Sequence, residues 1–438
     1  MMNDSHGDRR RVVITGVGLM SPLGIRRQSV QARLLAGESG IGPLTLMQHS
    51  AAPRNVGAEV RDFDEREAKK TYLQAQRKSL KVMCREIILG VASANLALED
   101  AGIDLATIDH DRLGVDFGAN LMFSPPEVLK DACWNCTDEE RRFHYEQWGD
   151  AGFARMEPLW LLKYLPNMPA CHIGIAADAR GPSNSITLDE ASGNLALGEA
   201  QRLIERNAAD VMIAGTTGTR LHPVKTLHAA LWDDLAESDG PPETWCRPFD
   251  AARTGQVLGE GACTFILEAA DHAERRGANI LAQVLGSGSS CVRDKSGRPG
   301  PRKALVGAMR AALRDAGFSP HEIGHVNAHG MGSIASDIEE TRAIHDVFGP
   351  HAAKVPVTGL KSYFGNSGSG CGTLELAGSI LALREGVVPK TLNLATPDPQ
   401  CPLSVVRGEH LPTDNPLVLS INVTRMGQAS ALVVRVVK

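Results

Sequence analysis

The strongest constraint on the fold is the stretch 181–198, in which a short strand-like segment meets a sharp turn and then a helix crowded with small residues. Ser185 to Leu188 have the apolar and β-branched character of a buried strand, and Asp189 and Glu190 interrupt it before a helical pattern starts at Ala191. Such a turn displays one side chain and points free helix N–H groups at nearby negative charge. We expect Glu190 to be the exposed residue at the mouth of the helix.

The helix after this turn and a second one like it indicate a duplicated architecture. Small residues recur between apolar ones in the first helix, so that neighbouring backbones can approach closely, as in a helix buried inside the protein. A second glycine-rich turn at 365–372 leads into another small-residue helix at 374–383. Two turns of this kind, each leading into a buried helix, suggest two pseudo-duplicated halves.

The remaining pattern alternates strands with helices, which predicts an α/β architecture with helices covering a sheet. Residues 121–165 interrupt this pattern with a stretch rich in charged and aromatic residues, which we interpret as an insertion that caps a site or a partner surface. The predicted strands are 12–20, 112–118, 210–215, 262–267, 325–328 and 355–360, and the predicted helices include 28–35, 80–101 and 304–316.

Composition favours an ordinary globular protein of the cytoplasm. Hydrophobic residues make up 43% of the 438, and a net charge of −5 gives no indication of a nucleic-acid partner. No run approaches the ~18 apolar residues of a membrane span. Nine scattered cysteines match reduced thiols, and the pair Cys133 and Cys136 is interpreted as incidental, so neither a metal nor a cofactor is expected.

Several separated motifs resemble those of the β-ketoacyl-ACP synthases, members of the thiolase-like superfamily. Their elbow reads Thr-Ala-Cys-Ala-Ser/Thr-Gly, and residues 188–193 read Leu-Asp-Glu-Ala-Ser-Gly, so Glu190 stands in the position of the acyl-accepting cysteine. The resemblance extends from Val12 to Val437. It implies a five-layered αβαβα fold with halves at 1–268 and 269–438, and a dimer formed through the edge strand that follows the elbow region.

The resemblance also assigns site residues in the second half. His329 matches the histidine that helps to bind and decarboxylate the malonyl group, whereas Asn366 occupies the place of the second catalytic histidine. Lys361 matches the lysine of the family's Lys-Ser-x-x-Gly-His motif, and Glu375 matches a buried glutamate of the family. The two are expected to form an ion pair under the site. Residues 255–261 match a family segment that we assign to turns and packing.

A gate beside the nucleophile departs from the family. Where the family carries Phe-Gly-Phe-Gly-Gly, residues 422–427 read Asn-Val-Thr-Arg-Met-Gly, which removes backbone freedom. Thr424, Arg425 and Met426 are therefore assigned to the pocket or gate. Arg425 is expected near Glu190, where the two charges compensate one another.

Three functions remain open on these grounds. The first is a non-condensing subunit similar to the chain-length factors of fatty-acid and polyketide-type acyl metabolism, because condensation needs an acylated thiolate and two histidine donors. The second is an acyl-thioester enzyme in which Glu190 and His329 perform acyl transfer, hydrolysis or decarboxylation. The third is a homodimeric acyl-binding scaffold. The expected partners are an acyl carrier protein or acyl thioester, and either a second copy or an active ketosynthase.

Overall fold

A mixed sheet of twelve strands runs through the computed structural model, which describes residues 9–438. Residues 1–8, which the sequence assigns to the first half, lie outside the described residues. The strand order is β13-β11-β10-β15-β16-β9-β1-β8-β7-β5-β6, with β2 paired to β1. The bounds are β1 (Val12–Ser21), β2 (Gly24–Ile25), β5 (Leu113–Ala119), β6 (Ser183–Ile186), β7 (Val211–Thr219), β8 (Glu260–Ala269), β9 (Ala282–Cys291), β10 (His325–Asn327), β11 (Pro356–Thr358), β13 (Ser404–Val405), β15 (Leu417–Val423) and β16 (Gln428–Val436).

The two halves of the chain occupy the two halves of this sheet. Strands β1 to β8 lie on one side and β9 to β16 on the other, and they are joined where β1 pairs with β9 over three residue pairs from Val12↔Val284 to Ile14↔Ala282. In each half the core strands are buried and rich in β-branched and small residues, as is typical of a sheet covered on both faces. The duplicated α/β architecture expected from the sequence is confirmed.

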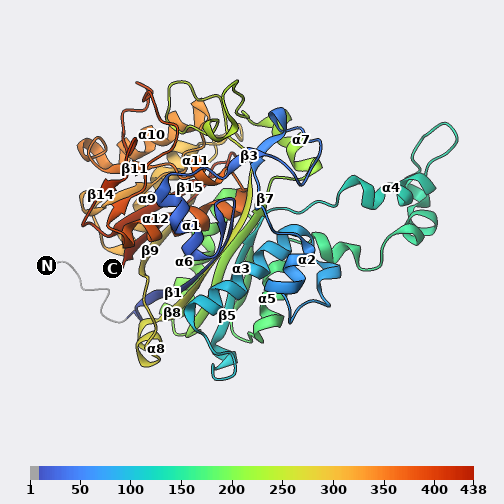
Figure 1. Cartoon of the computed structure of the whole chain (residues 1–438), viewed down its shortest axis with the longest axis horizontal. Coiled ribbons are helices and arrows are strands. Elements are labelled where there is room, and N and C mark those ends of the chain that lie inside the picture. Colours follow the sequence, from blue (N-terminus) through green and yellow to red (C-terminus); the bar gives the residue numbers. More distant parts are fainter. Residues whose placement is uncertain (1–8) are drawn as a thin grey trace.

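Helices form three layers around the two half-sheets (Figure 1). Helices α3 (Arg85–Ala101) and α5 (Met168–Ala177) pack against the first half, and α9 (Pro301–Ala316) and α10 (Ile334–Phe348) cover the second. Between them lie α6 (Ser192–Glu205) and α12 (Cys371–Arg384), which contact both halves and each other. The resulting order of helices, sheet, helices, sheet and helices is the five-layered arrangement that the resemblance implied.

The two central helices touch through glycines at their N-terminal ends. A Cβ atom at Gly193 would lie 2.8 Å from the backbone nitrogen of Thr373 and 3.0 Å from the Cα of Gly372. Only a residue without a side chain allows this approach. The small residues of the two helices therefore place the elbow beside the second glycine-rich turn, and the site residues of both halves meet there.

The inserted segment projects from the body of the molecule. It contains α4 (Pro126–Asn135) and several short helical turns, and Figure 1 shows α4 and its loops extending away from the sheet. Its aromatic side chains are largely exposed, with Tyr145 at 79% and Trp134 at 54%. The other elements are α1 (Arg27–Ala36), β3 (Ile41–Pro43), β4 (Val56–Ala58), α2 (Glu65–Glu67), α7 (Pro223–Trp232), α8 (Ala270–Arg275), α11 (Lys361–Phe364), β12 (Val387–Val388) and β14 (Leu411–Pro412).

Two expectations about strands near the elbow are wrong. The segment predicted as a buried strand at 185–188 is β6, which spans Ser183–Ile186, lies at the edge of the sheet and is partly exposed. The strand that follows the elbow is β7, which pairs with β5 and β8 on its two sides and is not an edge strand, so it has no open edge for a dimer contact. Among residues 9–438 no helix is long and apolar enough to cross a lipid bilayer.

Candidate functional site

The elbow turns at Asp189 rather than at Glu190. Asp189 has a φ of 41°, in the left-handed region, and its side chain is exposed, whereas Glu190 is only 2% exposed. The left-handed turn at Asp189 accompanies an inward placement of the next residue. The expectation that Glu190 stands exposed at the helix mouth is therefore wrong, because the side chain in the nucleophile position lies inside the protein.

Arg220 neutralises the buried carboxylate of Glu190. Its Nη2 lies 2.5 Å from Glu190 Oε1, and its Nη1 lies 3.4 Å from Asp233 Oδ2. Although burial disfavours the charge, the neighbouring carboxylates, Glu190 foremost, raise the pKa of Arg220 above its ordinary value. Glu190 is thus held as one partner of a largely buried ion pair, whose arginine side chain is 17% exposed.

Arg425 is not the partner of Glu190, as the sequence led us to expect. Its Nη1 lies 3.4 Å from Asp233 Oδ1, and its guanidinium sits over the ring of Trp232 at 5.8 Å. Arg220 and Arg425 therefore share Asp233 between them. The arginine that pairs with Glu190 follows β7, and β6 and β7 are both parallel to β5, so the residues after these two strands reach the same edge of the sheet.

Asn366 uses its amide on protein partners. Its Nδ2 donates to Glu190 Oε1 at 3.0 Å and to Gln256 Oε1 at 2.5 Å, and it also contacts the sulfur of Met331. Its Oδ1 accepts from the backbone N–H of Gly368 and lies 3.2 Å from Cys371 Sγ. Both amide hydrogens of the residue in the second histidine position are consequently engaged.

The predicted ion pair beneath the site is present. Lys361 Nζ lies 2.8 Å from Glu375 Oε1, donates to the carbonyl oxygen of His329 at 2.7 Å and lies 3.4 Å from His329 Nδ1. Asn422 completes the set by donating to Glu375 Oε2 at 3.1 Å. Although burial opposes its charge, Glu375 raises the pKa of Lys361 above its ordinary value, so that the ammonium has only donors to offer.

His329 is a neutral imidazole with a defined orientation. Burial, Lys361 and Arg220 hold its pKa well below the usual value. Because the ammonium of Lys361 can only donate toward Nδ1, the ring proton of His329 belongs on Nε2. The backbone N–H groups of His329 and Gly330 both donate to Glu340, which fixes the turn that carries the ring.

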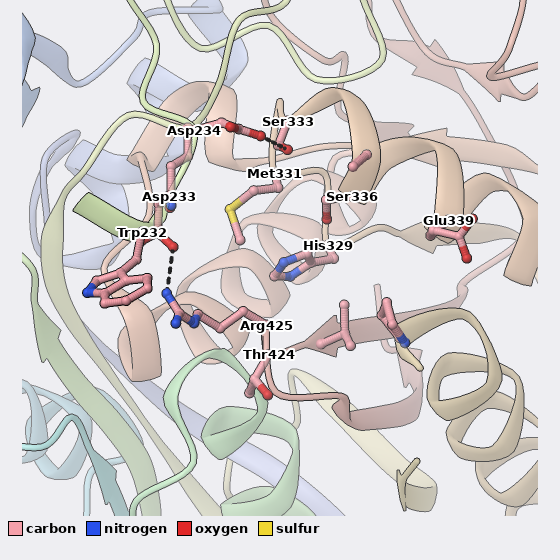
Figure 2. Close-up of a pocket in the computed structure, with 14 residues that line it drawn as sticks. Trp232, Asp233, Asp234, His329, Met331, Ser333, Ser336, Glu339, Thr424 and Arg425 are labelled. Carbon is pink, nitrogen blue, oxygen red and sulfur yellow. Dashed lines mark hydrogen bonds and ion pairs between the residues drawn. The ribbon is translucent and has the colours of Figure 1, made fainter. Parts of the chain in front are cut away.

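A pocket of about 290 Å³ reaches this histidine. Figure 2 shows the His329 ring directed toward the side of the pocket where Met331 and Arg425 lie, and on that same side Arg425 is bonded to Asp233. Neither Glu190 nor Asn366 is among the residues that line the pocket. The lining residues are Trp232, Asp233, Asp234, Gln256, Pro301, His329, Met331, Ser333, Ala335, Ser336, Glu339, Val423, Thr424 and Arg425.

The predicted gate residues divide between the pocket and the surface. Thr424 and Arg425 line the pocket, and Thr424 is fixed by a 2.8 Å bond to Gln428. Met426, which the sequence assigned with them, lies outside the pocket wall, is 40% exposed and contacts Arg293. Within residues 9–438, no group of three or more histidine, cysteine, aspartate or glutamate side chains is placed to hold a metal ion.

Three site residues were not found by the sequence reasoning: Arg220, Asp233 and Gln256. Arg220 carries a recognisable signal, since a charged residue directly after a buried strand lies at the same sheet edge as the elbow. Gln256 belongs to the segment assigned to packing, and nothing in its local pattern distinguishes a residue that binds Asn366. Asp233 follows α7 and has no sequence pattern that points to the site.

The fold and the site place this chain in the thiolase-like class of proteins. The features that this class shares are two similar half-sheets, two buried helices that meet at glycines, and an elbow beside a lysine-glutamate pair. The family profile described as "Beta-ketoacyl synthase, N-terminal domain" matches residues 9–273, and "Beta-ketoacyl synthase, C-terminal domain" matches residues 281–395. The chain belongs to the β-ketoacyl synthase family.

Relatives and solved structures agree with this assignment. The chain is 35% identical to the 3-oxoacyl-(acyl-carrier-protein) synthase 2 of Coxiella burnetii, over 92% of each chain, and 35% identical to nodulation protein E of Rhizobium meliloti, over 90% of this chain and 92% of the relative. A β-ketoacyl synthase from Burkholderia phymatum superposes with a TM-score of 0.85 at 28% identity, and the ishigamide ketosynthase/chain length factor with 0.82 at 26%. Both superpositions cover 98% of this chain and 100% of the other.

Proposed function

We propose that this chain is a non-condensing, chain-length-factor-like subunit that pairs with an active ketosynthase and acts on acyl groups held by an acyl carrier protein. The observation that carries the proposal is the state of Glu190. Its carboxylate occupies the family's nucleophile position and is bound by Arg220 at 2.5 Å and Asn366 at 3.0 Å. The position is filled by an internal ion pair instead of a reactive thiol.

The chemistry of Glu190 opposes acylation. A carboxylate forms no stable thioester, and attack on an acyl group would require Glu190 Oε1 to give up a charge-assisted bond to Arg220 and a second bond to Asn366. The residue is also absent from the walls of the pocket that reaches His329. An acyl group bound in that pocket would therefore not contact the elbow carboxylate directly.

The oxyanion chemistry is incomplete as well. Condensation needs two donors for the thioester oxygen and the departing carboxylate, and the loss of one oxyanion donor in other enzymes costs about 10²- to 10³-fold in rate. Here the Asn366 amide hydrogens already bind Glu190 and Gln256. His329 is the donor that remains at the pocket, which is insufficient for the usual reaction.

The partner half of the proposal rests on the fold and on similarity. Residues 9–438 have the family fold although the nucleophile is absent, as expected for a subunit whose surface is needed by a partner. One structural neighbour is described as a ketosynthase/chain length factor. An acyl carrier protein is included in the proposal because the Coxiella burnetii relative is named 3-oxoacyl-(acyl-carrier-protein) synthase 2.

One observation favours a second candidate, an acyl-thioester enzyme with changed chemistry. His329 lines the pocket as a neutral imidazole with its proton on Nε2, the form that donates to a thioester carbonyl. Thioester hydrolysis or acyl transfer through His329 then predicts release of the acyl group without formation of a new carbon-carbon bond. A homodimeric acyl-binding scaffold predicts neither release nor extension.

The test compares the isolated chain with the chain coexpressed with a candidate partner, a ketosynthase from the same genome that has the complete Cys-His-His set. Each preparation is incubated with acyl- and malonyl-acyl carrier protein, and intact mass and products are recorded. We expect no adduct, release or extension from the isolated chain, and extension only from the pair. Carbon-carbon bond formation or an adduct at Glu190 in the isolated chain contradicts the proposal. Acyl release that a His329→Ala variant loses identifies the second candidate.

A further inference from the structure

Two cavities meet at one small group of side chains beside the site. The pocket of about 290 Å³ that reaches His329 has a neighbour of about 350 Å³, which is enclosed by the segment after β5, the elbow and α7. Trp232, Asp233 and Arg425 line both cavities, so these three residues stand between them. Figure 2 shows the three side chains gathered at one side of the first pocket. We call these three residues the partition.

The contacts that close the partition are made by exposed side chains. Arg425 Nη1 lies 3.4 Å from Asp233 Oδ1, and the guanidinium lies 5.8 Å from the centre of the Trp232 ring. The side chain of Arg425 is 53% exposed, and Trp232 is 70% exposed. An ion pair and a cation–π contact at exposed positions each contribute little, because water competes for both charges. The arginine side chain can therefore move away without disturbing the core.

The backbone that carries Arg425 is fixed. Residues 424–427 form the tight turn between β15 and β16, where the backbone N–H of Gly427 donates to the carbonyl oxygen of Thr424 at 3.0 Å. The Thr424 hydroxyl accepts two further backbone N–H groups, both at 3.3 Å. The carbonyl oxygen of Gly427 accepts from the backbone N–H of Val292 at 2.9 Å, which ties the turn to a neighbouring segment. Opening the partition therefore requires a new rotamer of Arg425 and no movement of the loop.

The second cavity continues the first as a mainly neutral, partly apolar space. Its apolar surface comes from Leu121, Phe123, Ala229 and Trp232. The arginine and the lysine beyond the partition are compensated, because Arg220 binds Glu190 at 2.5 Å. Lys225 likewise binds Glu86 at 2.8 Å. The exposed carboxylate of Asp189 in the same wall disfavours an anion further, so an uncharged chain suits this cavity best.

We propose that the partition sets the length of the acyl chain that the His329 pocket holds. When Arg425 contacts Asp233, the pocket accepts a short acyl group, and when Arg425 turns away, a longer chain extends into the second cavity and contacts its apolar wall. Arg425 is thus a residue that determines specificity through its side-chain position. The inference rests on the acyl class of ligand in the proposed function, and it holds whether or not the chain condenses that group.

Two amides that differ in chain length test the partition. N-(2-acetamidoethyl)butanamide and N-(2-acetamidoethyl)decanamide are analogues of a short and a long acyl thioester that resist hydrolysis, and isothermal titration calorimetry on the full chain measures both affinities. In Arg425→Ala the decanamide should bind about tenfold tighter than in the unmodified chain, the gain from burying about two further methylene groups. The affinity for the butanamide should stay within about twofold.

Met426→Ala is the matched control for this variant. Met426 belongs to the same turn and lies outside the walls of both cavities, so this variant should bind both amides as the unmodified chain does. Salt provides a second measurement, because raising NaCl from about 50 mM to about 500 mM screens the exposed ion pair of Arg425. The preference for the decanamide should then rise in the unmodified chain and rise less in Arg425→Ala.

The possible failures of the two proposals can be told apart. An unchanged preference in Arg425→Ala, or an equal increase in Met426→Ala, overturns the role of the partition and leaves the proposed function as it stands. Binding of neither amide by any of the three proteins overturns the inference and also counts against an acyl ligand in the proposed function.

Discussion

Arg220 Nη2 lies 2.5 Å from Glu190 Oε1, and the two residues come from the two segments that follow parallel neighbours of the same strand. The guanidinium continues to Asp233, and Asp233 continues to Arg425. Four charges thus link the family's nucleophile position to the pocket mouth. A largely buried pair of this kind is costly to break from one side, because the remaining charge loses its partner.

The first prediction concerns the cost of removing only one charge of this ion pair. Arg220→Met leaves the Glu190 carboxylate buried with only the Asn366 amide, and should lower the free energy of unfolding by about 2–3 kcal/mol. Urea unfolding followed by circular dichroism measures the change. The double variant Glu190→Leu with Arg220→Met replaces both charges, so it should recover at least half of the loss. Stability of the single variant within ~0.5 kcal/mol of the unmodified chain contradicts a strong ion pair.

The sequence predicted site residues correctly only where they could be aligned with a motif of the family. The register put Glu190, His329, Asn366, Lys361 and Glu375 around one centre, and the structure brings them together because the two central helices meet at glycines. The ion-pair partner of Glu190 could not be predicted from that alignment. Choosing Arg425 for Glu190 relied on nearness to a gate in sequence, whereas the actual partner is decided by which strand ends lie at the same sheet edge.

The inward direction of Glu190 was also beyond the sequence. A strand-turn-helix pattern says where a turn occurs but not which residue takes the left-handed conformation, and a change of one residue exchanges the exposed and buried positions. Asp189 takes it here, at a φ of 41°. Aspartate is among the few residues besides glycine that adopt this conformation readily. The presence of aspartate at position 189 could therefore have indicated that this residue, and not Glu190, takes the left-handed conformation.

The second prediction concerns acid stability at the end of β8. Burial alone would raise the pKa of Glu268, but bonds from Arg276, His272 and Thr15 outweigh it and lower that pKa to about 2. The folded carboxyl binds fewer protons than the unfolded one, whose ordinary pKa is 4.5. Its stabilisation is therefore fully present above pH 4.5 and is lost as the pH falls toward 2, by on the order of 3 kcal/mol.

Glu268→Gln provides the measurement for this prediction. The variant should be less stable at pH 7, and its stability should fall less steeply between pH 5 and pH 2.5 than that of the unmodified chain, as read from urea unfolding at each pH. Glu274→Gln is a matched control, because Glu274 bonds Arg11 at a surface where both side chains are more than half exposed. Parallel pH profiles for Glu268→Gln and the unmodified chain contradict the assignment.

The third prediction tests the glycine contact that brings the halves together. Gly193→Ala places a Cβ 2.8 Å from the backbone nitrogen of Thr373, where only backbone movement relieves the clash, so we expect a loss of about 1–3 kcal/mol. Gly174→Ala in α5 is the control, since a Cβ there meets nothing within 4 Å and alanine should gain about 0.5–1 kcal/mol. Equal thermal midpoints for the two variants would show that the contact between the two central helices has room for a methyl group.

The last prediction is that Glu190→Cys, which restores the family's nucleophile, does not restore condensation. The introduced thiol keeps the elbow and the start of α6, both of which favour a thiolate, and Arg220 now lacks its carboxylate partner and stabilises the thiolate further. Acylation is therefore the step that the substitution can recover. Intact-mass measurement with acyl-acyl carrier protein should detect at most a slow adduct at position 190.

Extension should still fail, for reasons outside position 190. Asn366 changes no protonation state and its amide remains bonded to Gln256, so one of two oxyanion donors is missing, at a cost of about 10²- to 10³-fold. Adding Asn366→His to Glu190→Cys supplies the missing type of donor, and this pair should exceed the single variant in product formed from malonyl-acyl carrier protein. Turnover by Glu190→Cys alone at the level of the double variant would show that the second histidine position does not limit this protein.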